Sequence, residues 1–194
     1  MTPSPSSLAV ATLAPVLVRA GRSWIASQRE RHRPAAGPLE SERRAALEPF
    51  YDAWVLDAAR VRVVDRLEPP PLVGTARRLG IPLPLEIDRI AGIAFVDTIV
   101  LLDFVAESNR AALVFHEMVH VVQYHLLGLH GFMDRYARGW LESGRAYRAI
   151  PLEEHAYELT SRFVDAPTEG FDVVAEVERR LGAGPPVSPL ARQG

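Results

Sequence analysis

Apolar side chains recur along the first half of the chain at spacings typical of one helix and two strands. From Ser41 they follow a helical period, which predicts an amphipathic helix that ends near residues 57–59. Valines alternate with charged residues over positions 60–66, as in a short, half-buried strand. Residues 93–104 give the strongest strand signal, because β-branched and aromatic side chains dominate them. Residues 71–90, rich in Gly and Pro, predict turns between the two strands.

Helical signals dominate the second half of the chain. No Gly or Pro occurs from Glu107 to Leu127 and Gly128 follows, so we expect a long, largely buried helix that ends there. Further helices are predicted near residues 132–141, from Pro151 to about Val164, and over 171–181. Strands followed by packed helices predict an α+β fold with helices over a small sheet.

Three regions differ in composition. Residues 1–40 are rich in Pro, Ser, Ala and Arg and contain a charged run over 29–34, so we expect a flexible, solvated arm. Residues 41–182 carry the predicted strands and packed helices, which we expect to form one domain. Residues 183–194, again rich in Pro and Gly, predict a flexible tail.

The composition removes several classes of chemistry. The chain has no Cys, which excludes disulfides and thiolate nucleophiles and leaves His, Asp and Glu as metal ligands. All 22 basic residues are Arg, which excludes Schiff-base lysines and the phosphate-binding lysine of P-loops. A formal net charge of -2 argues against a broad electrostatic surface, so we expect no nucleic-acid partner.

An apolar stretch from Leu8 to Val18 is the nearest approach to a membrane or export signal. It is shorter than the roughly 18 to 20 residues that span a bilayer, and Thr12 and Pro15 interrupt it. No Arg precedes it, although a secretory signal has a positively charged start. We therefore expect no integral membrane segment and a cytoplasmic location, with secretion left open.

The predicted long helix contains the motif H-E-x-x-H at residues 116–120. At about 100° per residue, His116 and His120 lie one turn apart on the same face, so both imidazoles can reach one metal ion. Glu117 stands one step round the helix, where it can take a proton from a metal-bound water. Gln123 returns to the metal-facing side and can orient a ligand or simply pack.

A catalytic zinc site needs a third protein ligand and one open position. His125 lies about 180° round the helix from the first motif histidine and faces away from the metal. His130 lies beyond the glycine that ends the helix and can reach the metal only if the chain turns back. The later helix offers Glu153 and Glu154, either of which can approach an antiparallel neighbour.

These residues resemble those of the gluzincin metallopeptidases, and more closely the small, minimal-core zinc-dependent members. The resemblance rests on the strings His116 to Tyr124 and Pro151 to Tyr157 and on the strand before them, and covers roughly residues 50–164. It implies a zincin-like fold, in which an active-site helix and a ligand-bearing helix pack on a small sheet. It also implies one zinc ion (Zn2+) per chain, held by the two motif histidines and one downstream Glu.

In that family a small residue, often Ala, follows the ligand Glu after three positions. Ala156 stands three residues after Glu153, whereas Tyr157 stands three after Glu154, so the resemblance favours Glu153 as the third ligand. Many gluzincins place an Asp one residue further on, where it orients a ligand His. Tyr157 occupies that position in this chain.

Peptide hydrolysis also requires a group that stabilises the oxyanion, usually Tyr, His or Arg. Tyr147 and Arg148 come just before the ligand helix and are the two candidates, with Tyr147 taken first. We expect the strand from Ile93 to Leu102 to flank the cleft and to bind extended peptide through its backbone.

The sequence therefore predicts a zinc metallopeptidase that acts on a peptide or protein substrate, with Glu117 as the general base. Two alternatives stay open. One is a non-catalytic, zinc-stabilised interaction module with the same ligands, and the other is a helical core without a metal. The sequence does not indicate an oligomeric state.

Overall fold

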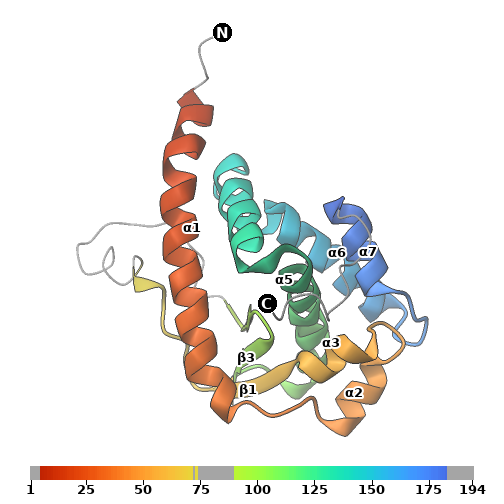
Figure 1. Cartoon of the computed structure of the whole chain (residues 1–194). Helices are drawn as coiled ribbons and strands as arrows, with labels where there is room; N and C mark the ends of the chain where they lie inside the picture. The colour runs from red at the N-terminus through yellow and green to blue at the C-terminus, as the bar shows by residue number, and fades with distance from the viewer. Residues whose placement is uncertain (1–4, 72, 74–89, 183–194) are drawn as a thin grey trace, which may run out of the picture.

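The computed structural model describes residues 5–71, 73 and 90–182. Within them the chain has a mixed α+β fold, mostly helical, with a small three-stranded sheet (Figure 1). Most of the turn-rich segment predicted at 71–90, and the tail predicted at 183–194, lie outside the described residues. The elements, in chain order, are α1 (Pro5–His32), η1 (Arg33–Ala35), α2 (Ser41–Leu47), α3 (Ala53–Ala58), β1 (Arg60–Val64), β2 (Gly92–Phe95), β3 (Thr98–Leu102), α5 (Glu107–Glu142), η3 (Tyr147–Ala149), α6 (Pro151–Asp165) and α7 (Val173–Leu181).

The sheet has the strand order β1-β3-β2. β1 runs parallel to β3, and β2 runs antiparallel to it, so β3 is the central strand and β2 is an edge strand. The single strand predicted over residues 93–104 is therefore wrong. A tight turn divides it into β2 and β3, because Val96 has a left-handed φ of 64° and Asp97 follows in the turn.

The one helix predicted from Ser41 to residues 57–59 is also divided. α2 ends at Leu47 and α3 begins at Ala53. Pro49 lies between them and cannot continue a helix, because it has no N–H to donate and its ring clashes with the preceding turn. The predicted apolar face is still used, since Leu47, Phe50 and Val55 are all buried in the core.

α5 forms the centre of the molecule and has a kink at Gly128. Its first half is buried almost continuously from Val114 to Tyr124, in contact with the sheet and with α6. Gly128 has φ 65° and ψ 166°, a combination essentially restricted to glycine. The second half of α5 leaves this kink in a new direction and packs beside α1 (Figure 1). The predicted stop at Gly128 is therefore confirmed as a change of direction between two helical segments.

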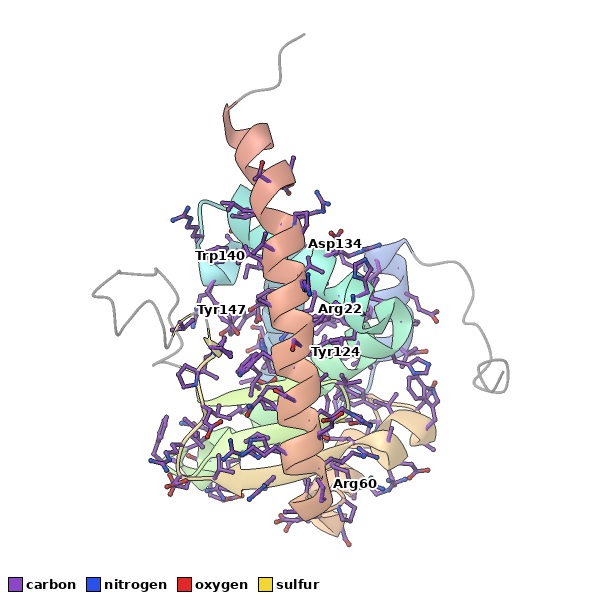
Figure 2. The ribbon with its side chains drawn as sticks, turned by 60° about the vertical axis from the view of Figure 1, so that its left-hand side comes forward. Arg22, Arg60, Tyr124, Asp134, Trp140 and Tyr147 are labelled. Carbon is purple, nitrogen blue, oxygen red and sulfur yellow. The ribbon has the colours of Figure 1, made fainter. Side chains whose placement is uncertain are left out.

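α1 differs from the flexible arm predicted over residues 1–40. It is a helix of 28 residues that lies across the sheet and α5 (Figure 2). Trp24 packs edge-on against Phe95 of β2, and Arg29 donates two hydrogen bonds of 2.7 Å to the Asp97 carboxylate in the β2–β3 turn. Its partners are distant in sequence, which is why local composition did not reveal them.

α1 also contains the apolar stretch considered above as a possible membrane or export signal. None of the helices in the described ranges is both long enough and apolar enough to cross a membrane.

We predict that Gly128→Ala lowers the free energy of unfolding by about 1 to 3 kcal/mol, because alanine is strained at this backbone conformation. The space around Gly128 is open, so a steric clash of the new methyl group does not contribute. Urea unfolding measures the change. Gly131→Ala is the matched control in the same helix, where an added Cβ makes only ordinary contact, and it should raise stability by up to about 1 kcal/mol. Equal effects of the two variants would contradict the assignment of the kink.

Candidate metal centre

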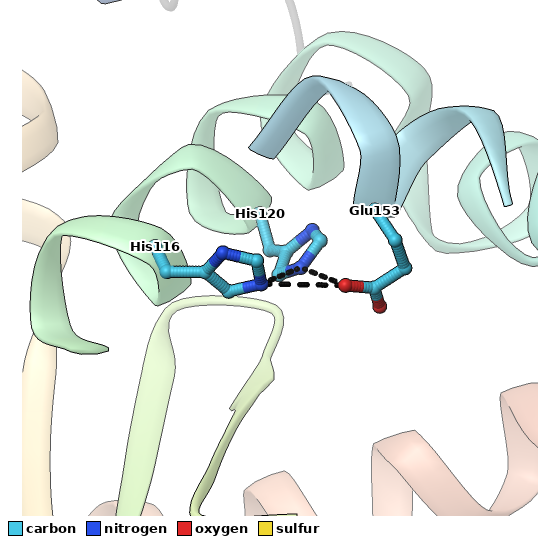
Figure 3. A group of neighbouring side chains, drawn as sticks. All are labelled: His116, His120 and Glu153. Atoms are coloured by element: carbon cyan, nitrogen blue, oxygen red, sulfur yellow. Dashed lines mark hydrogen bonds and ion pairs between the residues drawn. The ribbon is translucent and has the colours of Figure 1, made fainter. Parts of the chain in front are cut away.

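Three buried side chains from two helices converge on one point (Figure 3). α5 contributes His116 and His120, one helical turn apart, and the first turn of α6 contributes Glu153. The two imidazole Nε2 atoms are 3.2 Å apart, and Glu153 Oε2 lies 3.3 Å from Nε2 of His116 and 3.4 Å from Nε2 of His120. The three residues are only 3% to 6% exposed.

This group has the geometry and the chemistry of a metal site. Ligand atoms at roughly 2.0 to 2.1 Å from a tetrahedral zinc ion lie about 3.3 to 3.4 Å from each other, close to the three distances observed here. Two imidazoles and one carboxylate are also a common donor set of zinc sites with an open fourth position. A buried His–His–Glu group that could hold a metal ion is therefore present, and the donor set alone does not fix which metal.

Both imidazoles donate a hydrogen bond from Nδ1 to a neighbouring side chain, which leaves both Nε2 atoms available for a metal. Nδ1 of His120 lies 2.8 Å from the amide oxygen of Gln123, whose own NH₂ group donates to the Leu152 carbonyl at 3.1 Å. On His116, Nδ1 lies 3.5 Å from the Thr160 hydroxyl. Because Thr160 donates its proton to the Ala156 carbonyl, its oxygen can only accept from the imidazole. Each imidazole is thus held in the tautomer that presents an Nε2 lone pair.

The Glu153 carboxylate is oriented by two tyrosines. The Tyr136 hydroxyl donates a hydrogen bond of 2.9 Å to Oε1, the oxygen that does not face the histidines. Tyr147, from the short helix η3, also hydrogen-bonds Glu153, and the pKa of Tyr147 is raised by burial and by the nearby Glu153 and Glu117 carboxylates. Both phenols therefore keep their protons at neutral pH and act as donors.

The pKa values of the buried ligands are set by their removal from water and by their charges on one another. Burial by itself lowers the pKa of His120, but the Glu153 carboxylate outweighs it and raises that pKa to about 9. Burial likewise raises the pKa of Glu153, but the two imidazoles outweigh it and hold that pKa well below its usual range. In the protein without metal, a proton on His120 takes the place of the positive charge that a metal ion would supply.

Glu117 lies beside the three ligands without belonging to them. It is 4% exposed, and the backbone N–H of Ala94 on the edge strand β2 donates to its carboxylate. Burial raises the pKa of Glu117 above the usual range, although the two histidines oppose this. A desolvated carboxylate with a raised pKa is suited to accept and return a proton.

The other residues considered from sequence lie away from the three ligands. Glu154 is exposed and pairs with Arg180 at 3.4 Å, so the carboxylate that joins the two histidines is Glu153. His125 is exposed against the Trp54 ring, and His130 is exposed as well. Arg148 lies over the ring of Tyr157, 4.7 Å from its centroid.

Sequence reasoning missed two side chains that contact the ligands. Thr160 stands seven residues after Glu153, so the helical repeat of α6 places it on the same face, and this signal could have found it. Tyr136 lies beyond the kink of α5, and no local pattern brings that part of the chain back to Glu153.

Comparison with known proteins gives no relative from which a role could be transferred. No protein-family model, no curated protein and no solved structure matches the chain. The case for a metal site therefore rests on the arrangement of the side chains themselves.

We predict that the purified protein binds about one metal ion per chain. Mutation of a residue that only hydrogen-bonds a ligand typically lowers metal affinity about 10- to 100-fold, and we expect Glu153→Ala, which removes a ligand, to lower it further. Elemental mass spectrometry after dialysis against zinc measures the content. Glu154→Ala removes an exposed neighbouring carboxylate and should retain the metal. If both variants kept one ion per chain, Glu153 would not be a ligand.

We also predict that the pH dependence of stability differs between the metal-free and the zinc-loaded protein. The folded-state pKa of His120, about 9, lies above its ordinary value of 6.5, so the proton stabilises the metal-free protein fully below pH 6.5. As the pH rises from 6.5 to 9, chelator-treated protein should lose up to about 3 kcal/mol of unfolding free energy. The zinc-loaded protein should not show this loss.

Urea unfolding at a series of pH values tests this prediction. His130→Gln changes an exposed histidine and should leave the pH dependence unaltered. A metal-free protein with constant stability over this range would show that His120 carries no extra proton.

Proposed function

We propose that the protein is a zinc-dependent peptidase of the gluzincin type, in which His116, His120 and Glu153 hold the metal. One observation carries the proposal: a fourth buried side chain, Glu117, lies beside the ligands but stays outside the group. A site that only holds two helices together has no use for a second desolvated carboxylate, whereas hydrolysis needs a base at this place.

The residues present fit the metal that this function requires. When bound, zinc lowers the pKa of a water molecule and polarises a peptide carbonyl, and three protein ligands leave a position for both roles. The hydrogen bonds that the two imidazoles donate to Gln123 and Thr160 keep their rings oriented toward the metal position, and the one that Tyr136 donates to Glu153 orients the carboxylate.

In this proposal Glu117 carries the proton. Its raised pKa makes it a stronger base than an exposed carboxylate, so it can remove a proton from the attacking water. It then delivers the same proton to the nitrogen of the leaving amine. The N–H of Ala94 holds the carboxylate in place between the two transfers.

Tyr147 and the edge strand complete the proposed site. Tyr147 remains protonated and lies near both Glu117 and Glu153. Because a phenol has one O–H, we propose that Tyr147 turns this donor from Glu153 to the oxyanion of the hydrolysed amide when substrate binds. β2 is an edge strand beside Glu117, and we propose that an extended peptide pairs with those of its backbone groups that neither β3 nor Glu117 engages. The proposed substrate is accordingly a peptide or a protein segment in extended form.

A second candidate function has support from the burial of the group. All three ligands are at most 6% exposed, as in metal sites that join helices rather than bind substrate. The alternative is a non-catalytic interaction module stabilised by zinc. The two candidates make opposite predictions for Glu117.

We predict that Glu117→Gln keeps one zinc ion per chain and lowers peptide hydrolysis about 10²- to 10⁴-fold, because the amide cannot accept the proton. The assay incubates zinc-loaded protein with a mixture of unmodified peptides and counts new amino termini by mass spectrometry. Zinc content is measured on the same samples.

Glu154→Gln is the matched control, since it neutralises an exposed carboxylate on α6 and should leave hydrolysis unchanged. If wild type and Glu117→Gln both hold zinc and neither cleaves any peptide, the peptidase proposal is wrong and the interaction module is favoured.

A further inference from the structure

Arg148 is connected to the candidate metal centre through one aromatic ring. Its guanidinium carbon lies 4.7 Å from the centroid of the Tyr157 ring, and that ring lies 4.5 Å from the His116 ring. Tyr157 also lies close enough to Tyr147 for the two phenols to influence each other. The order outward from the metal ligands is therefore His116, Tyr157 and Arg148.

Within the described part of the chain, the charge of Arg148 is not balanced by an acid. Its side chain is exposed, and among the residues that the structure describes no Asp or Glu forms an ion pair with it. Arg138, Arg162 and Arg180, in the same half of the chain, each pair with a carboxylate. The contact with the Tyr157 ring orients the guanidinium while leaving its N–H donors available.

We propose that Arg148 binds a carboxylate of the substrate and so selects anionic peptides at this site. The inference rests on the proposed function, because it takes the metal centre as the place where the peptide is held. A guanidinium binds a planar carboxylate through two parallel hydrogen bonds, which a carboxamide cannot match in strength. The carboxylate is either the C-terminus of a short peptide or an acidic side chain.

The distances limit where that carboxylate can stand. The contacts of 4.7 Å and 4.5 Å together span less than three extended residues, at roughly 3.3 to 3.6 Å each. With a few further ångströms from the His116 ring to the metal and from the guanidinium to a bound carboxylate, the anionic group lies within about five residues of the bond at the metal. Tyr147 and Arg148 are adjacent in sequence but relate differently to the metal ligands. Tyr147 hydrogen-bonds the ligand Glu153 directly, whereas Arg148 is connected to the ligand His116 through the Tyr157 ring.

Binding of zinc-directed probes tests the inference without requiring catalysis. The probes are dipeptides with an N-terminal hydroxamate, which chelates zinc: Leu-Ala with a free carboxylate, Leu-Ala amide, Leu-Asp amide and Leu-Asn amide. Dissociation constants are measured by calorimetry on full-length, zinc-loaded protein. We expect at least one carboxylate probe to bind about tenfold more tightly than its matched amide, and the preferred pair identifies the C-terminal or the side-chain carboxylate.

Arg148→Gln should abolish this preference and leave the affinity for the amide probes unchanged. Arg145→Gln is the matched control, because Arg145 also stacks on an aromatic ring, that of Trp140, 5.5 Å away. It should retain the tenfold preference. Equal affinities for acid and amide in both pairs, a preference that survives in Arg148→Gln, or no binding of any hydroxamate would each overturn the inference.

The outcome is separable from that of the proposed function. A carboxylate preference that depends on Arg148, in a protein that cleaves no peptide, would support this anion site and contradict only the peptidase. Cleavage that depends on Glu117 but shows no preference for anionic peptides would support the peptidase and contradict the anion site.

Discussion

The candidate site depends on the close approach of α5 and α6. One carboxylate on α6 can meet two imidazoles on α5 only if no large side chain separates the helices, and small residues permit this. Ala156, one turn after Glu153, is fully buried, and at Gly139 an added Cβ would come within 2.7 Å of the Pro151 ring. A larger residue at Gly139 would clash with Pro151, two residues before Glu153, and we expect it to move Glu153 away from the histidines.

A second constraint is that the contact between α5 and α6 buries three polar side chains, His116, His120 and Glu153. Two Nε2 lone pairs and a carboxylate face one another out of contact with water, an arrangement that is costly unless a cation lies among them. A proton on His120 meets part of that need and a metal ion meets all of it. The hydrogen bonds with Gln123, Thr160 and Tyr136 then orient the three ligands, because each one engages the ligand atom that faces away from the metal position.

The N-terminal helix supports the same site from a distance. α1 covers Phe95 with Trp24 and His32, and Arg29 and Arg33 hold Asp97 in the turn between β2 and β3. That turn fixes the edge strand whose Ala94 N–H contacts Glu117. A segment that composition assigned to a mobile arm is in this way linked to the residue that we propose as the base.

Local patterns in the sequence were enough to place the helix that carries His116 and His120, whereas the preference for Glu153 over Glu154 came from the resemblance to the gluzincins. The histidine pair could be placed because its spacing of four residues lies within about one helical turn, whereas helical geometry alone left both glutamates of α6 open. The β2–β3 turn, the packing of α1 and the contact of Tyr136 with Glu153 were decided only by tertiary structure. Each of these depends on a backbone conformation or on partners far apart in the chain, and hydrophobic periodicity carries no information about either.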